Sequence, residues 1–74
     1  MNEEVVQQVY ASNYMDEMSE QQFRSLLLRG LQLVSQLSDT DKLFISRFFK
    51  GDDLKAVNIA LTYNQELMIK LLSQ

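Results

Sequence analysis

Residues 53–73 are the stretch that most limits how this chain folds, because neither glycine nor proline interrupts them. The stretch is about two to three turns longer than a typical globular helix. At about 100° per residue, its apolar side chains form one stripe that stays in phase from end to end. The stripe comprises Leu54, Val57, Leu61, Met68, Leu71 and Leu72, flanked by Ala60 and Leu67. This continuity predicts a single long helix that closes the chain.

A break at Thr62 is the alternative, and it would divide the stretch into two shorter helices. The residues to compare are then Arg47, Phe48, Phe49, Gly51, Leu54, Lys55, Ala56, Val57, Leu61, Met68 and Leu71. With the break, this pattern resembles the helix-turn-helix of sigma-factor region four and of LuxR-type regulators. The resemblance implies a DNA-binding regulator, with Arg47, Lys50, Lys55 and Lys70 as the candidate nucleic-acid contacts. The sequence departs from that family at the turn, where Thr62 stands in place of a glycine with positive φ and a β-branched residue is disfavoured.

Asn64 lies within the apolar stripe and has three interpretations. It is an exposed residue at the edge of the stripe, the N-cap of a second helix, or a buried polar residue that fixes the register of paired helices.

The composition restricts how a chain of 74 residues can be stabilised, because it contains no cysteine and no histidine. Disulfides and thiolate metal sites are excluded, and a core of this size is marginal. We therefore expect one small domain that depends on helix packing, self-association or a partner. No apolar run is long enough to span a membrane, and the first residues do not resemble a secretory signal, so we expect a cytoplasmic protein.

Residues 1–18 form an acidic N-terminal arm without any lysine or arginine. Val5, Val6, Val9 and Tyr10 recur at helical spacing, which predicts a short helix that docks on its own body or on a neighbouring chain. Ser19 with Gln22 then matches a capping box, so the helical body begins at residue 19. We expect helices at about 20–36, 39–50 and 53–73, and hence an all-α bundle of three to four helices.

Two glycines have predicted roles in this bundle. Gly30 falls inside the apolar stripe of the second helix, which indicates the close approach of another backbone. Gly51 follows the next helix and is well placed for left-handed geometry at its end.

The helix predicted over residues 39–50 has an apolar surface that extends around more of the helix than one-sided burial requires. So short a chain covers such a helix with difficulty, and burial against a partner is the favoured interpretation, ahead of internal burial. The predicted protein interface consists of Leu28, Phe44, Ile45, Phe48, Phe49, Ile59 and Ile69.

Catalytic and metal-binding patterns are missing from the sequence. The adjacent acid pairs point about 100° apart on a helix and do not converge, and two glycines cannot make a phosphate-binding loop. We expect no enzyme, no cofactor, no metal site and no small-molecule ligand. The sequence instead predicts a helical protein-interaction module, such as an adaptor, an inhibitor or a chaperone-like subunit. It would self-associate or cap an apolar groove on a partner protein.

Overall fold

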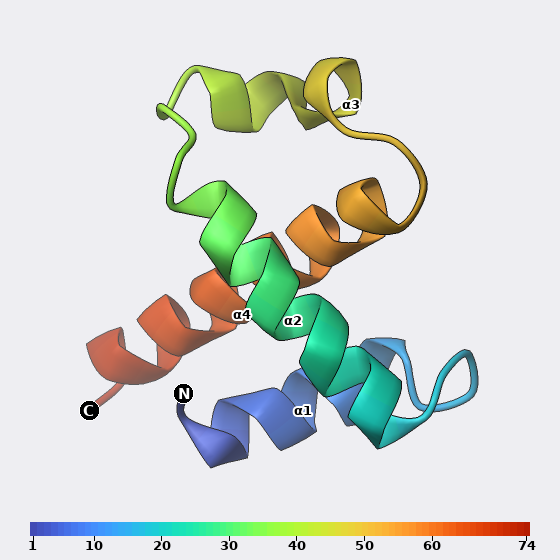
Figure 1. Ribbon diagram of the computed structural model, residues 1–74. Helices are drawn as coiled ribbons and strands as arrows, with labels where there is room; N and C mark the ends of the chain where they lie inside the picture. The colour runs from blue at the N-terminus through green and yellow to red at the C-terminus, as the bar shows by residue number, and fades with distance from the viewer.

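The C-terminal stretch forms one unbroken helix, α4 (Gly51–Leu72), in the computed structural model, which describes all residues 1–74 (Figure 1). Thr62 lies inside this helix, and its hydroxyl donates a hydrogen bond to the carbonyl oxygen of Asn58 at 2.9 Å. No residue other than Gly51 has a positive φ. The prediction of a single long helix is confirmed, and the turn at Thr62 is absent.

Three further α-helices precede α4: α1 (Glu3–Asn13), α2 (Glu20–Val34) and α3 (Ile45–Phe48), with a 3-10 turn, η1 (Asp41–Phe44), directly before α3. The predicted all-α class is confirmed. The Ser19 hydroxyl accepts a hydrogen bond from the backbone N–H of Gln22, as the capping pattern predicts. In Figure 1, α2 crosses α4, while α1 lies at one end of the molecule and α3 at the other.

The crossing of α2 over α4 is built on small residues. A Cβ atom placed on Gly30 would lie 1.9 Å from the carbonyl oxygen of Ala56 and 2.9 Å from the Cβ of Ala60. Only a glycine allows the two backbones to approach this closely, so the predicted role of Gly30 is confirmed. The crossing lies in the first half of α4, and the last turns of that helix therefore extend beyond α2.

The N-terminal helix docks on its own body. Val5, Val6 and Val9 are buried in the same core as α2 and α4. The backbone N–H of Asn2 donates to the hydroxyl of Tyr63 at 2.9 Å, and the hydroxyl of Tyr10 donates to the carbonyl oxygen of Met18 at 2.9 Å. The buried hydrophobic residues are Val5, Val6, Val9, Met18, Phe23, Leu27, Val34, Ala56, Val57, Ile59, Ala60 and Tyr63.

The buried face of α4 is wider than the apolar stripe predicted from the sequence, because it also includes Ile59. The sequence pattern puts Ile59 on a polar face with Glu66 and Lys70, yet Ile59 is 0% exposed. The reason is that α1 covers this face: Glu4 forms an ion pair with Lys70, and the Gln8 amide lies 3.5 Å from the carboxylate of Glu66. Long polar side chains thus line the contact, and Ile59 packs beneath them in the core.

The accessible surface of the molecule is slightly larger than that of a typical compact monomer of the same mass. Its accessible area is 5077 Å², whereas a compact monomer of 8.6 kDa has about 4,700 Å². Its radius of gyration of 12.1 Å likewise exceeds the roughly 11.3 Å expected for this length. Ten large hydrophobic side chains are among the exposed residues.

Candidate protein-interaction surface

The candidate functional residues lie on the surface of the molecule and not in an internal cavity. No pocket is present, and no group of three or more acidic, histidine or cysteine side chains converges in the structure. None of the helices combines the length and the apolarity of a membrane crossing. The side chains that stand out are large apolar ones exposed to water, and most of them gather in two places.

The first cluster lies around η1 and α3, and we name it the α3-end surface. Its members are Leu43, Phe44, Arg47, Phe48 and Lys50. Leu43 is 77% exposed and Phe48 is 55% exposed, which are high values for side chains of this size. Neighbouring Ile45 and Phe49 are partly buried against the core and hold the segment in place.

The local structure explains why these side chains spread outward. The Ser38 hydroxyl accepts a hydrogen bond from the N–H of Asp41 and starts the 3-10 turn. Phe44 leaves helical geometry (φ −128°, ψ 36°), so η1 and α3 are separate turns, and the continuous helix predicted over 39–50 is wrong. β-Branched and aromatic residues are poor helix formers, and this segment is rich in them. After Phe49, which is extended, Gly51 takes the predicted left-handed conformation (φ 60°) where α4 begins.

The structure divides the predicted interface residues into three groups. Phe44 and Phe48 are exposed together on the α3-end surface, with Ile45 and Phe49 anchored beneath. Leu28 and Ile69 are also exposed, but they lie on α2 and near the end of α4, outside that surface. The prediction is wrong for Ile59, because its side chain is 0% exposed within the core and cannot contact another molecule.

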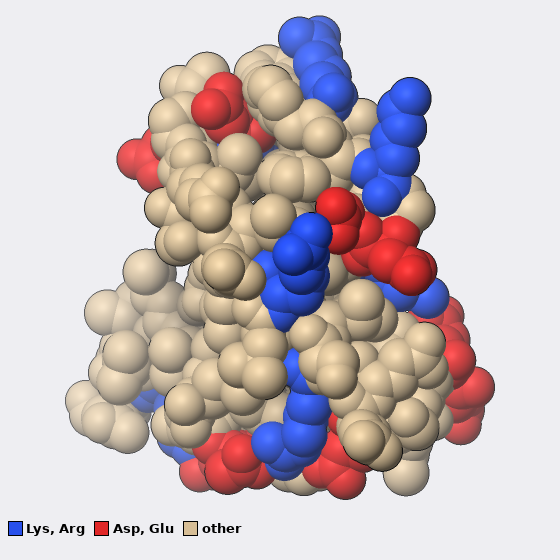
Figure 2. Space-filling model, in the orientation of Figure 1, with Lys and Arg blue, Asp and Glu red and all other residues tan.

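Basic side chains accompany the aromatic ones on the α3-end surface. The guanidinium carbon of Arg47 lies 4.7 Å from the centre of the Phe44 ring, a cation–π distance. Residues 42–50 include three bases and no acid. Figure 2 shows Lys and Arg side chains standing out at the end of the molecule formed by α3. The surface therefore combines exposed aromatic rings with positive charge.

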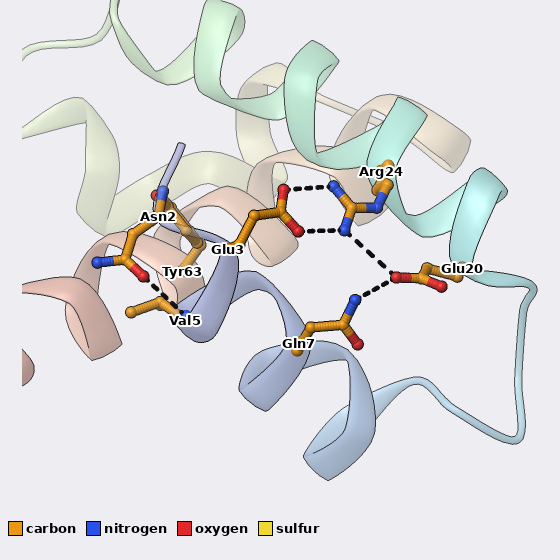
Figure 3. A network of polar contacts seen from close by, with 7 residues as sticks. All are labelled: Asn2, Glu3, Val5, Gln7, Glu20, Arg24 and Tyr63. Atoms are coloured by element: carbon orange, nitrogen blue, oxygen red, sulfur yellow. Dashed lines mark hydrogen bonds and ion pairs between the residues drawn. The ribbon is translucent and has the colours of Figure 1, made fainter.

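Four of the seven bases form ion pairs within the chain. Arg24 forms two hydrogen bonds with the Glu3 carboxylate, at 2.8 and 2.5 Å, and lies 3.3 Å from Glu20, as Figure 3 shows. The hydrogen bond from Arg24 holds the pKa of Glu3 below its ordinary range. The other paired bases are Arg29 with Asp53, Lys42 with Asp39 and Lys70 with Glu4.

Three bases have no carboxylate partner, namely Arg47, Lys50 and Lys55. They lie on α3, on the residue before α4 and on the first turns of α4. These are three of the four residues predicted as nucleic-acid contacts in the alternative interpretation. The fourth, Lys70, is on the last turns of α4 and is paired with Glu4, so the structure does not bring it to the others.

The second exposed cluster is predicted only in part, because Ile69 belongs to the predicted interface whereas Met68, Leu71 and Leu72 are assigned to the core stripe of the last helix. We name it the α4-end surface, and it consists of Asn64, Met68, Ile69, Leu71 and Leu72. Leu72 is 80% exposed and Met68 is 63% exposed. The predicted stripe does continue through Met68, Leu71 and Leu72, but these side chains are exposed because no further helix of the chain covers them.

Comparison with protein-family models, curated proteins and solved structures gives no match for this chain.

Proposed function

We propose that this chain is a small helical protein-interaction module, an adaptor or an inhibitor, that acts through its α3-end surface. The observation that carries the proposal is that Leu43, Phe44 and Phe48 stay exposed while Ile45 and Phe49 fix their backbone to the core. Aromatic residues and arginine are the types enriched at binding hot spots. The cytoplasmic location expected from the sequence forms part of this proposal.

The charge of the surface specifies the partner. Arg47 and Lys50 have no carboxylate in the chain to neutralise them, so an acidic segment on another protein complements them. Apolar side chains on the same segment would cover the rings of Phe44 and Phe48. We therefore infer that the partner presents a short acidic and apolar element, such as one face of an amphipathic helix.

A photo-crosslinking amino acid placed at residue 48 tests this proposal in cells that produce the protein. We expect one protein adduct, and mass spectrometry should locate the crosslink in an acidic, apolar segment. The same amino acid at residue 28 is the control, because Leu28 is as exposed as Phe48 but lies on α2 without the basic cluster. Equal labelling from both positions, or no adduct from residue 48, would contradict the proposal.

A nucleic-acid adduct at residue 48 would support the alternative function instead. The three unpaired bases favour that alternative, while the net charge of −3 and the missing turn at Thr62 oppose it. Binding to duplex DNA would decrease steeply with added salt. A titration with DNA at two salt concentrations therefore separates the two functions.

Phe48→Asp gives a second test with the purified protein and the identified partner. Burying a charge against the partner's apolar side chains should weaken binding at least about tenfold, since truncation of an interface aromatic costs this much or more. Leu28→Asp carries the same change of charge on another surface and should leave binding unchanged. Phe49→Asp is unsuitable, because Phe49 packs against the core and its loss would unfold the segment.

A further inference from the structure

The last turns of α4 present an apolar face that no other part of the chain covers. Contacts with α1 reach as far as Lys70 but lie on the face that includes Ile59, and α2 crosses near Ala56. Figure 1 shows the C-terminal end of α4 projecting from the body. Met68, Leu71 and Leu72 are each more than half exposed on the remaining face.

This face continues a seam that begins inside the molecule. Leu54, Val57, Leu61, Asn64, Met68 and Leu71 are separated by alternating steps of three and four residues, which is the spacing of a helix that packs against another helix. The first three of them are buried or partly buried in the chain's own core. The last three are exposed, so the same seam lacks a helix only over its second half.

The absence of charge on the α4-end surface permits a second copy of the same surface to cover it. Its members, Asn64, Met68, Ile69, Leu71 and Leu72, carry no charge, and Gln65 beside them is also neutral. A two-fold interface brings a surface against its own copy, which like charges would oppose. The α3-end surface, with its unpaired bases, would repel a copy of itself, whereas the α4-end surface would not.

We propose that the α4-end surface binds the same surface of a second copy of this chain and so forms a two-fold dimer. Met68 is at the middle of the exposed seam and lies near the two-fold axis. Asn64 then becomes a polar residue of the seam, where such a residue fixes the register of paired helices. This dimer leaves both α3-end surfaces free, so the proposal goes beyond the function proposed above and does not depend on it.

The available area sets the strength of the dimer. Full burial of a leucine or methionine removes roughly 100 Å² of apolar surface from water, so the four apolar members of this surface offer roughly 250 Å² per copy. A standard stable interface buries about 800 Å² per partner. The dimer is therefore weak and reversible, with a dissociation constant of roughly 10 µM to 1 mM.

Sedimentation over a concentration series tests the proposal, with Met68→Arg as the variant. Arginine is compatible with the C-terminal end of a helix, so α4 should remain folded while the seam gains a like-charge contact across the two-fold axis. We expect the dissociation constant to rise at least about tenfold. Leu28→Arg is the matched control and should sediment like the wild type. A monomer at every concentration up to about 1 mM would overturn the proposal. So would a dimer that survives Met68→Arg but is lost in Phe48→Asp.

Crosslinking through Met68→Cys provides an independent measurement that does not require a charged substitution. The chain has no cysteine of its own, so any disulfide must join two introduced thiols. Mild oxidation should give a covalent dimer much faster than it does for Leu28→Cys. Equal rates for the two variants would contradict the proposed interface. Partner binding at the α3-end surface should be unaffected in all α4-end variants, which separates failure of this proposal from failure of the proposed function.

Discussion

Replacing Gly30 with alanine tests the packing on which the whole fold depends. In an open helix this change is favourable by about 0.5–1 kcal/mol, because glycine is a poor helix former. In this structure the added methyl group would lie 1.9 Å from a carbonyl oxygen of α4 and 2.5 Å from its carbonyl carbon. Both atoms belong to the backbone, so no side-chain rotation relieves the clash and the two helices must move apart.

The size of the effect follows from these two opposing contributions. Overpacking a core by one methyl group costs about 1–3 kcal/mol, and the upper end applies where backbone must shift. After subtraction of the helix-propensity gain, we expect a net loss of about 2 kcal/mol. For a domain of this length, 1 kcal/mol changes Tm by roughly 6 °C, so Tm should fall by roughly 12 °C.

Thermal unfolding followed by far-ultraviolet circular dichroism, at a concentration where the protein is monomeric, is the appropriate assay. Ser25→Ala is exposed on the same helix and should change stability by no more than about 0.5 kcal/mol. Gly51→Ala meets no atom within 4 Å and should lose only about 1 kcal/mol through its positive φ. An increase in Tm for Gly30→Ala, of the size expected in an open helix, would show that α2 and α4 are not in this close contact.

Two further predictions concern the junction of α1 and α2. Ser19→Ala removes the hydroxyl that accepts from the Gln22 N–H and should cost about 1 kcal/mol by chemical denaturation, whereas Ser12→Ala, at an exposed position in α1, should have little effect. Glu3 has a lowered pKa when folded, so its ion pair with Arg24 contributes stability above the ordinary glutamate pKa of about 4.3, and this contribution is lost as the pH falls through the folded value. Glu3→Gln should therefore be less stable than the wild type at neutral pH but nearly equal at strongly acidic pH; a difference that stays constant with pH would contradict this account.

Local signals in the sequence were sufficient to predict most of the helices. The close approach at Gly30 is indicated by a glycine within an apolar stripe, although its partners Ala56 and Ala60 are distant in the sequence. The Ser19 cap and the left-handed Gly51 depend on residues near one another in the chain, and all three predictions are confirmed. The unbroken α4 was predicted for the same reason. The helix expected over 39–50 was wrong because apolar periodicity does not register the break at Phe44, where a dense run of poor helix formers interrupts the helix.

The candidate surfaces could be predicted only in part, because burial depends on which helix lies over each face. Phe44 and Phe48 belong to the predicted interface, and both are exposed. The rest of the chain is too short to cover the segment on which they lie. Ile59 was misplaced because the polar residues beside it pair with α1 instead of facing water. No local pattern in α4 indicates that its polar face receives another helix.

The position of one glycine explains why the apolar stripe of α4 divides into a covered half and an exposed half. The two halves share the same apolar spacing, so spacing alone does not account for the difference in burial. It arises because Gly30 lets α2 cross only where Ala56 and Ala60 are also small, near the start of α4. A crossing further along would place α2 over Met68 and Leu71, but no residue there is small enough to permit it. The exposed α4-end surface is therefore a consequence of the same contact that stabilises the core.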